Sequence, residues 1–147
     1  MSRNRLLYVV VALALPLAAC GQGQTEAAHD PPAAVTEIEG TELSRITLVA
    51  SAAERLGIET ATAEEARGQG RARIAVPYSA ILYAPDGRTW VYTNPEELVY
   101  QRAEVVVDSI DGDQAILSEG LAEGDTVVTI GAAELFGTET GVGGSAH

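Results

Sequence analysis

The feature that most constrains the fold is a series of short runs of β-branched and aromatic residues, each ended by a turn signal, between residues 45 and 137. Runs of about four to eight such residues, bounded by glycine, proline, asparagine and aspartate, are typical of antiparallel strands. The clearest turns are the segments APDG at 84–87 and DG at 111–112, which contain favoured hairpin residues. The sequence therefore predicts one mainly β domain.

The strands are expected at residues 46–50, 58–63, 72–83, 89–92, 98–110, 115–117 and 125–130. Pro77 interrupts the third run and indicates a bulge, a crossing or a sheet edge. Residues 80–83 and 89–92 are expected to form a hairpin, and the segment NPEE at 94–97 is expected to turn the chain into the longest strand.

Two short helical segments accompany the strands. Ser51 is expected to cap the first, at residues 52–56, with Glu54 as its capping-box partner and Gly57 at its end. The second, at residues 132–136, precedes Gly137 and could cover one end of the sheet.

The first residues have the layout of a secretory signal. Arg3 and Arg5 precede an apolar run of 14 residues at 6–19, which is shorter than the roughly 20 residues that a membrane-spanning helix needs. Its end, LAAC at 17–20, resembles the lipobox of bacterial lipoproteins, in which cleavage falls between the residues here numbered Ala19 and Cys20. This resemblance implies that Cys20 carries acyl chains such as palmitate and anchors the chain to a membrane.

Four segments are expected along the chain. Residues 1–19 form the signal peptide, and residues 20–44 form the lipidated cysteine and a disordered tether rich in glycine, glutamine and acids. Residues 45–137 form the β domain, and residues 138–147 form a flexible tail.

Charge and composition exclude several classes of function. All nine basic residues are arginines, so no lysine is present for a Schiff base or a phosphate-binding loop. The formal net charge of −12 has the wrong sign for neutralising phosphates, which argues against nucleic-acid binding.

The titratable residues predict neither a catalytic nor a metal site. His29 and His147 fall in the tether and the tail, so no histidine is available in the domain as a general base or a zinc ligand. Asp108, Asp111 and Asp113 lack the spacing of a calcium loop and are expected at a solvated hairpin. We expect no enzymatic activity, no metal and no cofactor.

Three aromatic residues have two possible roles. Trp90 and Tyr92 share one face of their expected strand and, with Tyr100, could form an exposed platform for a partner. More often such a stripe is the core of a small sheet.

Two parts of the domain resemble the periplasmic adaptors, or membrane fusion proteins, of efflux pumps of the resistance-nodulation-division type. Residues 46–61 (ITLVASAAERLGIETA) resemble the family's opening segment. Residues 76–82, 88–93 and 121–131 resemble its closing membrane-proximal domain, with Val-Pro-x-Ser-Ala at 76–80 and Gly-Leu-x-x-Gly-Asp-x-Val-Val at 120–128 as the more specific patterns. The resemblance implies a small β-roll or barrel-like membrane-proximal domain.

The chain departs from the family between these two parts. A full adaptor inserts a β-barrel, a lipoyl-like domain and a long α-helical hairpin there, whereas only residues 64–71 lie between the parts in this sequence. The resemblance therefore implies a truncated adaptor that retains the membrane-proximal domain alone.

The implied function is that of an accessory binding module of an efflux or metal-export transporter. Its expected partners are the membrane, through the lipid anchor, and an inner-membrane transporter or a full-length adaptor, and its expected location is the periplasmic side of the cell envelope. The alternative is an envelope lipoprotein that binds a small ligand or a metal ion on the same scaffold.

Overall fold

The computed structural model describes residues 31–66 and 73–141. Its elements in chain order are β1 (Ala33–Glu37), β2 (Ser44–Leu48), α1 (Ala50–Leu56), β3 (Glu59–Thr62), β4 (Glu64–Glu65), β5 (Ile74–Pro77), a 3-10 turn (Tyr78–Ala80), β6 (Leu82–Tyr83), β7 (Thr89–Glu96), β8 (Val99–Asp111), β9 (Gln114–Glu119), β10 (Thr126–Ile130) and α2 (Ala132–Glu139). The predicted mainly β class with two short helices is confirmed. Neither helix in the described ranges has the length and apolar character that crossing a membrane requires.

The strands form one barrel-like antiparallel sheet in the order β3-β10-β7-β8-β9-β5-β4. The two ends of this order are consecutive in the chain, because only Ala63 separates β3 from β4. β3 pairs with β10 and β4 pairs with β5, so the extended segment 59–65 joins the two edges and closes the sheet.

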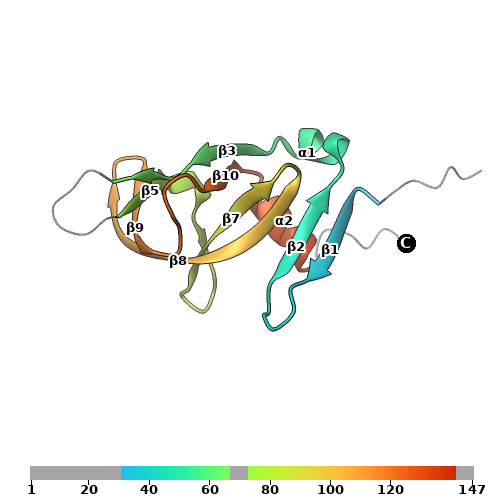
Figure 1. Ribbon diagram of the computed structural model, residues 1–147, viewed down its shortest axis with the longest axis horizontal. Helices are drawn as coiled ribbons and strands as arrows, with labels where there is room; N and C mark the ends of the chain where they lie inside the picture. Colours follow the sequence, from blue (N-terminus) through green and yellow to red (C-terminus); the bar gives the residue numbers. More distant parts are fainter. Residues whose placement is uncertain (1–30, 67–72, 142–147) are drawn as a thin grey trace, which may run out of the picture.

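The long curved strand β8 connects this barrel to a second layer (Figure 1). Its last part pairs with β9, and its first part lies between β7 and β2. β2 also pairs with β1, and the two strands stand beside α2 at the end of the molecule opposite β9.

Two apolar cores lie on opposite sides of the sheet. The first fills the barrel and contains Val91 and Val127, both fully buried. The second lies between β2, β7, β8, β10 and the two helices, and it contains the next residues along the same strands, Tyr92 and Val128. Because successive side chains point to opposite faces, β7 and β10 are buried on both faces, which accounts for their unbroken apolar runs.

Two turns with glycine follow the predictions. Gly57 adopts the left-handed conformation and ends α1. The Asp111–Gln114 pair closes the hairpin between β8 and β9, with Gly112 at positive φ. The predicted hairpin at 80–92 is also present, although its first strand shortens to Leu82–Tyr83 because Tyr78–Ala80 forms the 3-10 turn.

The predicted tether is wrong in its second half. Residues 33–37 form β1, whose five residues pair with β2, and Ala33 packs against the second core. An edge strand can be held by backbone hydrogen bonds without large apolar side chains, so its composition resembled that of a linker.

The predicted start of the tail is also wrong. Helix α2 continues beyond Gly137 to Glu139. The extension is held by the Glu139 side chain, which hydrogen-bonds to Tyr92 and Arg102 of the sheet.

Two local predictions are corrected. Val49, not Ser51, is the N-cap of α1, no side chain caps that helix end, and Ser51 lies within the helix. Residues 94–96 continue β7 with a bulge, and the turn falls at Glu97 and Leu98, where Leu98 takes a positive φ of 62°.

Candidate functional site

The three aromatic residues predicted as a platform lie in the core instead. Trp90, Tyr92 and Tyr100 are 6%, 0% and 4% exposed. Tyr92 and Tyr100 belong to the second core, where they pack with residues of β2 and α2. Their burial matches the core role that the sequence analysis also allowed, and it leaves no exposed face for a partner on Tyr92 or Tyr100.

Tyr92 takes part in a buried polar group with two residues that the sequence analysis did not single out. Its hydroxyl donates a hydrogen bond to Oε2 of Glu139, and Nη2 of Arg102 donates to Oε1 at 3.2 Å. The Glu139 side chain is 4% exposed and that of Arg102 is 16% exposed. Burial and the hydrogen bond to Glu139 raise the pKa of Tyr92 above its ordinary value, so the phenol stays protonated.

This group attaches α2 to the sheet. Arg102 lies directly opposite Tyr92 in the β7–β8 ladder, and Glu139 reaches both from the last residue of the helix. A charged pair with little access to water needs further hydrogen bonds to offset its desolvation, and the Tyr92 hydroxyl supplies one. The arrangement is structural and also fixes the position of Arg102.

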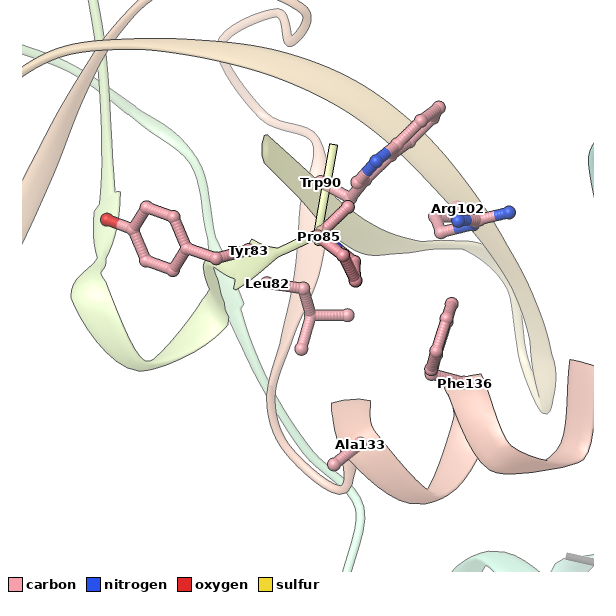
Figure 2. Close-up of a pocket in the computed structure, with 8 residues that line it drawn as sticks. Leu82, Tyr83, Pro85, Trp90, Arg102, Ala133 and Phe136 are labelled. Atoms are coloured by element: carbon pink, nitrogen blue, oxygen red, sulfur yellow. The ribbon is translucent and has the colours of Figure 1, made fainter. Parts of the chain in front are cut away.

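Arg102 stands at the wall of a small apolar cavity of about 140 Å³ (Figure 2). Its guanidinium carbon lies 4.5 Å from the ring centre of Trp90 and 5.4 Å from that of Phe136. Arg88 also lies over the indole, at 5.0 Å. The residues that line the cavity are Leu82, Tyr83, Ala84, Pro85, Trp90, Arg102, Ala133 and Phe136.

Five separate segments build this cavity, and β8 contributes Arg102. Leu82 comes from β6, Pro85 from the following turn, Trp90 from β7, and Phe136 from α2. Figure 2 shows the Trp90 and Phe136 rings and the Arg102 guanidinium around one space, with Leu82 and Pro85 on its other side and Ala133 below. The hairpin turn and the helix thus form opposite sides of the opening.

Among the residues that the structure describes, two buried donors belonging to lining residues have no hydrogen-bond partner. They are Nε1 of Trp90 and Nε of Arg102. Buried N–H groups are almost always paired with protein or water, and an unpaired one costs about 1 to 3 kcal/mol. Both atoms are fully buried, so the accessible wall of the cavity does not include them.

Tyr83 has a different role from the other lining residues. It is 60% exposed, and Figure 2 shows its ring directed away from the cavity. It stands next to the ring of Tyr78, with 6.4 Å between the ring centres and a tilt of 57°.

Asp108, Asp111 and Asp113 are exposed, as the sequence analysis expected. Glu64 and Glu65 are exposed on β4, and with Asp111 they line an open groove. Within residues 31–66 and 73–141, no three His, Cys, Asp or Glu side chains are grouped closely enough to hold a metal ion. Ala19, Cys20, His29 and His147 lie outside the described residues.

The sequence analysis missed Arg102, Phe136 and Glu139 as site residues. A signal for Arg102 was missing, because the predicted turn at 94–97 would place residue 99, and not Arg102, opposite Tyr92. No signal existed for Glu139 either, because it lay in a segment without apolar periodicity.

No protein-family model matches the chain, and no curated protein matches it significantly. Among solved structures, the chain is similar to an NMR structure of a 180-residue segment of SilB from Cupriavidus metallidurans CH34, which comprises the N-terminal metal-binding site and the membrane-proximal domain. The sequences are 27% identical, the TM-score is 0.47, and the likeness covers 57% of this chain and 48% of that chain. The matched part thus spans about half the length of the SilB segment.

Proposed function

We propose that this protein is a lipid-anchored, adaptor-like accessory module of an efflux or metal-export transporter, located on the periplasmic side of the cell envelope. The observation that carries the proposal is the closure of one sheet by two distant parts of the chain. β2 and β3, from the part that resembles an adaptor's opening segment, pair with β8 and β10 of the closing part.

One of the two family-like patterns lies where these two parts of the chain meet. In the segment 120–128, Oδ2 of Asp125 accepts a hydrogen bond from the amide of Ala122 at 2.8 Å and so fixes a turn. The same turn bonds to Ala63 of the opening part twice, since the Ala63 amide donates to the Asp125 carbonyl and the Gly124 amide donates to the Ala63 carbonyl. The pattern therefore joins the closing part of the chain to the opening part.

The second pattern, at residues 76–80, ends β5 and forms the 3-10 turn. Val76 and Ala80 are fully buried in the barrel core, and Pro77 pairs with Gln114 at the end of the β5–β9 ladder. Proline is tolerated at such a strand end because the strand stops there.

The link between the two parts is a short hairpin. β4 and β5 pair through Glu64 with Ala75 and through Glu65 with Ile74. An adaptor carries its barrel, lipoyl-like domain and α-helical hairpin at the corresponding point, so the module proposed here would bind a transporter without supplying a duct.

The lipid anchor gives a weak interface sufficient strength. Cleavage before Cys20 and acylation of its thiol would hold the domain at the membrane surface. Confinement of that kind raises the effective concentration of a membrane partner to about the millimolar range. Transporter binding would then need only modest intrinsic affinity.

Affinity capture of the full chain from native membranes in mild detergent tests the proposal. We expect an inner-membrane transporter or a full-length adaptor to be identified with the wild type by mass spectrometry. The Cys20→Ser variant should remain unlipidated, leave the membrane fraction and capture far less of the partner. Capture of neither protein class by a lipidated, membrane-bound wild type would refute the proposal.

A further inference from the structure

We infer that the outer edge of β1 is an interaction surface for a second copy of this chain, whose own β1 pairs with it in antiparallel orientation. This self-association depends neither on the lipid anchor nor on the transporter partner proposed above.

β1 has one paired edge and one unpaired edge. Among the strands that the structure describes, only β2 pairs with it. Figure 1 shows β1 as the outermost strand at its end of the molecule, and four of its five residues are exposed. An exposed edge of this kind is a template for pairing with another chain.

The hydrogen bonds that flank the ladder show which side of β1 is occupied. The Val49 amide donates to the Pro32 carbonyl at 3.1 Å, and the Ile38 amide donates to the Leu43 carbonyl at 3.0 Å. In an antiparallel pair, the backbone groups of alternate residues point to the same side of the strand. The register is unbroken between these two bonds, so the even-numbered residues of β1 face β2.

The N–H and C=O groups of the odd-numbered residues Ala33, Val35 and Glu37 therefore point to the unpaired side. In an antiparallel pair of two β1 strands centred on Val35, this residue lies opposite its own copy. Ala33 then lies opposite Glu37 of the second copy, and Glu37 opposite Ala33. Each of these three pairs can exchange two hydrogen bonds, so this register uses all six outward donors and all six outward acceptors.

β1 also lacks the features that usually protect an exposed edge. Natural edge strands are protected by proline, by lysine or by a bulge. Residues 33–37 contain no proline and no lysine, and their pairing with β2 has no register shift. Nothing within β1 itself therefore prevents a further strand from pairing.

The side chains make β1 complementary to itself. Val35 is 44% exposed and lies opposite the fully buried Ile46 of β2. In the centred register, the two Val35 side chains meet between the two Ile46 side chains and form one apolar row across both molecules. Glu37, the single charged residue of β1, lies opposite an alanine, so like charges do not face each other.

The contact is small, so the dimer should be weak. A pair of five-residue strands buries far less than the roughly 800 Å² per partner of a standard interface. Each chain also has a formal net charge of −12, and the resulting repulsion is screened by salt. We expect a Kd of about 0.1 mM near physiological salt, and tighter association as the salt concentration rises.

Single-cysteine crosslinking of the full chain tests the edge. In a chain carrying Cys20→Ser, Val35→Cys supplies the only thiol. In the centred register the two Cα atoms would be about 5.5 Å apart, which is within disulfide range. Thr47→Cys is the matched control, because Thr47 is also exposed but lies on β2, which is paired on both sides. At a chain concentration of about 0.2 mM, we expect disulfide-linked dimer to form at least about fivefold faster with Val35→Cys.

A proline variant tests the hydrogen bonds. Val35→Pro removes an N–H that points away from β2, so the β1–β2 ladder should remain intact. In the dimer, both hydrogen bonds of the central pair would be lost. We expect the Kd for self-association, measured by analytical ultracentrifugation of the full chain in mild detergent, to rise at least about tenfold. The urea unfolding midpoint should stay nearly unchanged.

Three results would overturn the inference. They are a wild-type chain that stays monomeric up to about 1 mM, equal crosslinking rates of the two cysteine variants, and unchanged self-association of a folded Val35→Pro variant. If a monomeric wild type captured a membrane protein that Val35→Pro loses, the edge would instead bind a strand of that protein. The cysteine variants decide the matter even if Val35→Pro does not fold.

Discussion

Tyr92 and Arg102 face each other across the β7–β8 ladder, and both side chains bind the same carboxylate, that of Glu139. Tyr92 contributes an uncharged donor and Arg102 a charged one. Through this arrangement the last residue of α2 is bonded to the middle of the sheet. The stability of the helix and the shape of the neighbouring cavity therefore depend on one buried carboxylate.

Replacing that carboxylate should destabilise the fold. Glu139→Gln leaves the Arg102 guanidinium, 16% exposed, without its counter-ion. We expect the free energy of unfolding to fall by about 2 to 3 kcal/mol, measured by urea unfolding followed by circular dichroism. The control is Glu134→Gln, an exposed acid on the same helix, which should change it by less than about 0.5 kcal/mol. Equal effects of the two substitutions would contradict the assigned role of Glu139.

The buried phenol should make the fold sensitive to alkali. Burial, with the hydrogen bond to Glu139, raises the pKa of Tyr92 above its ordinary value of 10.0, so above this pH the unfolded chain releases a proton that the folded chain keeps. The unfolded state then binds fewer protons, and the free energy of unfolding falls as pH rises, by up to about 1.4 kcal/mol per pH unit for one residue.

Tyr92→Phe should remove this contribution. Between pH 10 and 11 we expect a shallower decline in the variant's unfolding free energy than in the wild type's. Tyr100, whose pKa is raised by burial, remains in both proteins and contributes equally. Parallel pH curves for the two proteins would show that Tyr92 does not titrate in this way.

Gly120 should tolerate no side chain. It has a φ of +113°, and a Cβ built there would lie 2.8 Å from Cα of Val105 and would also meet the Glu104 carbonyl oxygen. Both obstacles are backbone atoms, so Gly120→Ala should cost about 3 kcal/mol of unfolding free energy.

The matched control for this position is Gly87→Ala. Gly87 also has a positive φ, of +87°, but no atom lies within 4 Å of the added Cβ. We therefore expect a loss of about 1 kcal/mol from backbone strain alone. Thermal unfolding of both variants measures the difference, and similar losses would mean that β8 does not approach Gly120 closely.

Much of the barrel could be predicted from the sequence because its signals are local. The APDG segment at 84–87 and the DG pair at 111–112 locate two hairpins, and β-branched runs locate the strands that these hairpins join. The sequence of β7 also indicates burial on both faces. Its apolar residues follow one another, whereas a half-exposed strand alternates apolar and polar residues.

Features that depend on long-range contacts could not be predicted. β1 has no apolar pattern and is held by pairing with β2, while Glu139 acquires its role only when α2 meets the sheet. The cavity likewise needs five segments to meet, and of its residues the sequence analysis singled out only Trp90. The unpaired N–H groups of Trp90 and Arg102 can be identified only when burial is known.

The central claim is that the opening and closing parts of the chain close one sheet together. Cysteine crosslinking tests this claim most directly. Thr62 of β3 pairs with Thr126 of β10, and opposite residues on antiparallel strands are close enough for a disulfide. The test introduces Thr62→Cys and Thr126→Cys into a full chain carrying Cys20→Ser, which removes the single native cysteine. A control chain carries Thr36→Cys on β1 in place of Thr62→Cys, because β1 pairs with β2 and not with β10. The account predicts rapid intramolecular disulfide formation under mild oxidation in the first chain and little in the control. Equal yields from both chains, or no crosslink in the first, would contradict it.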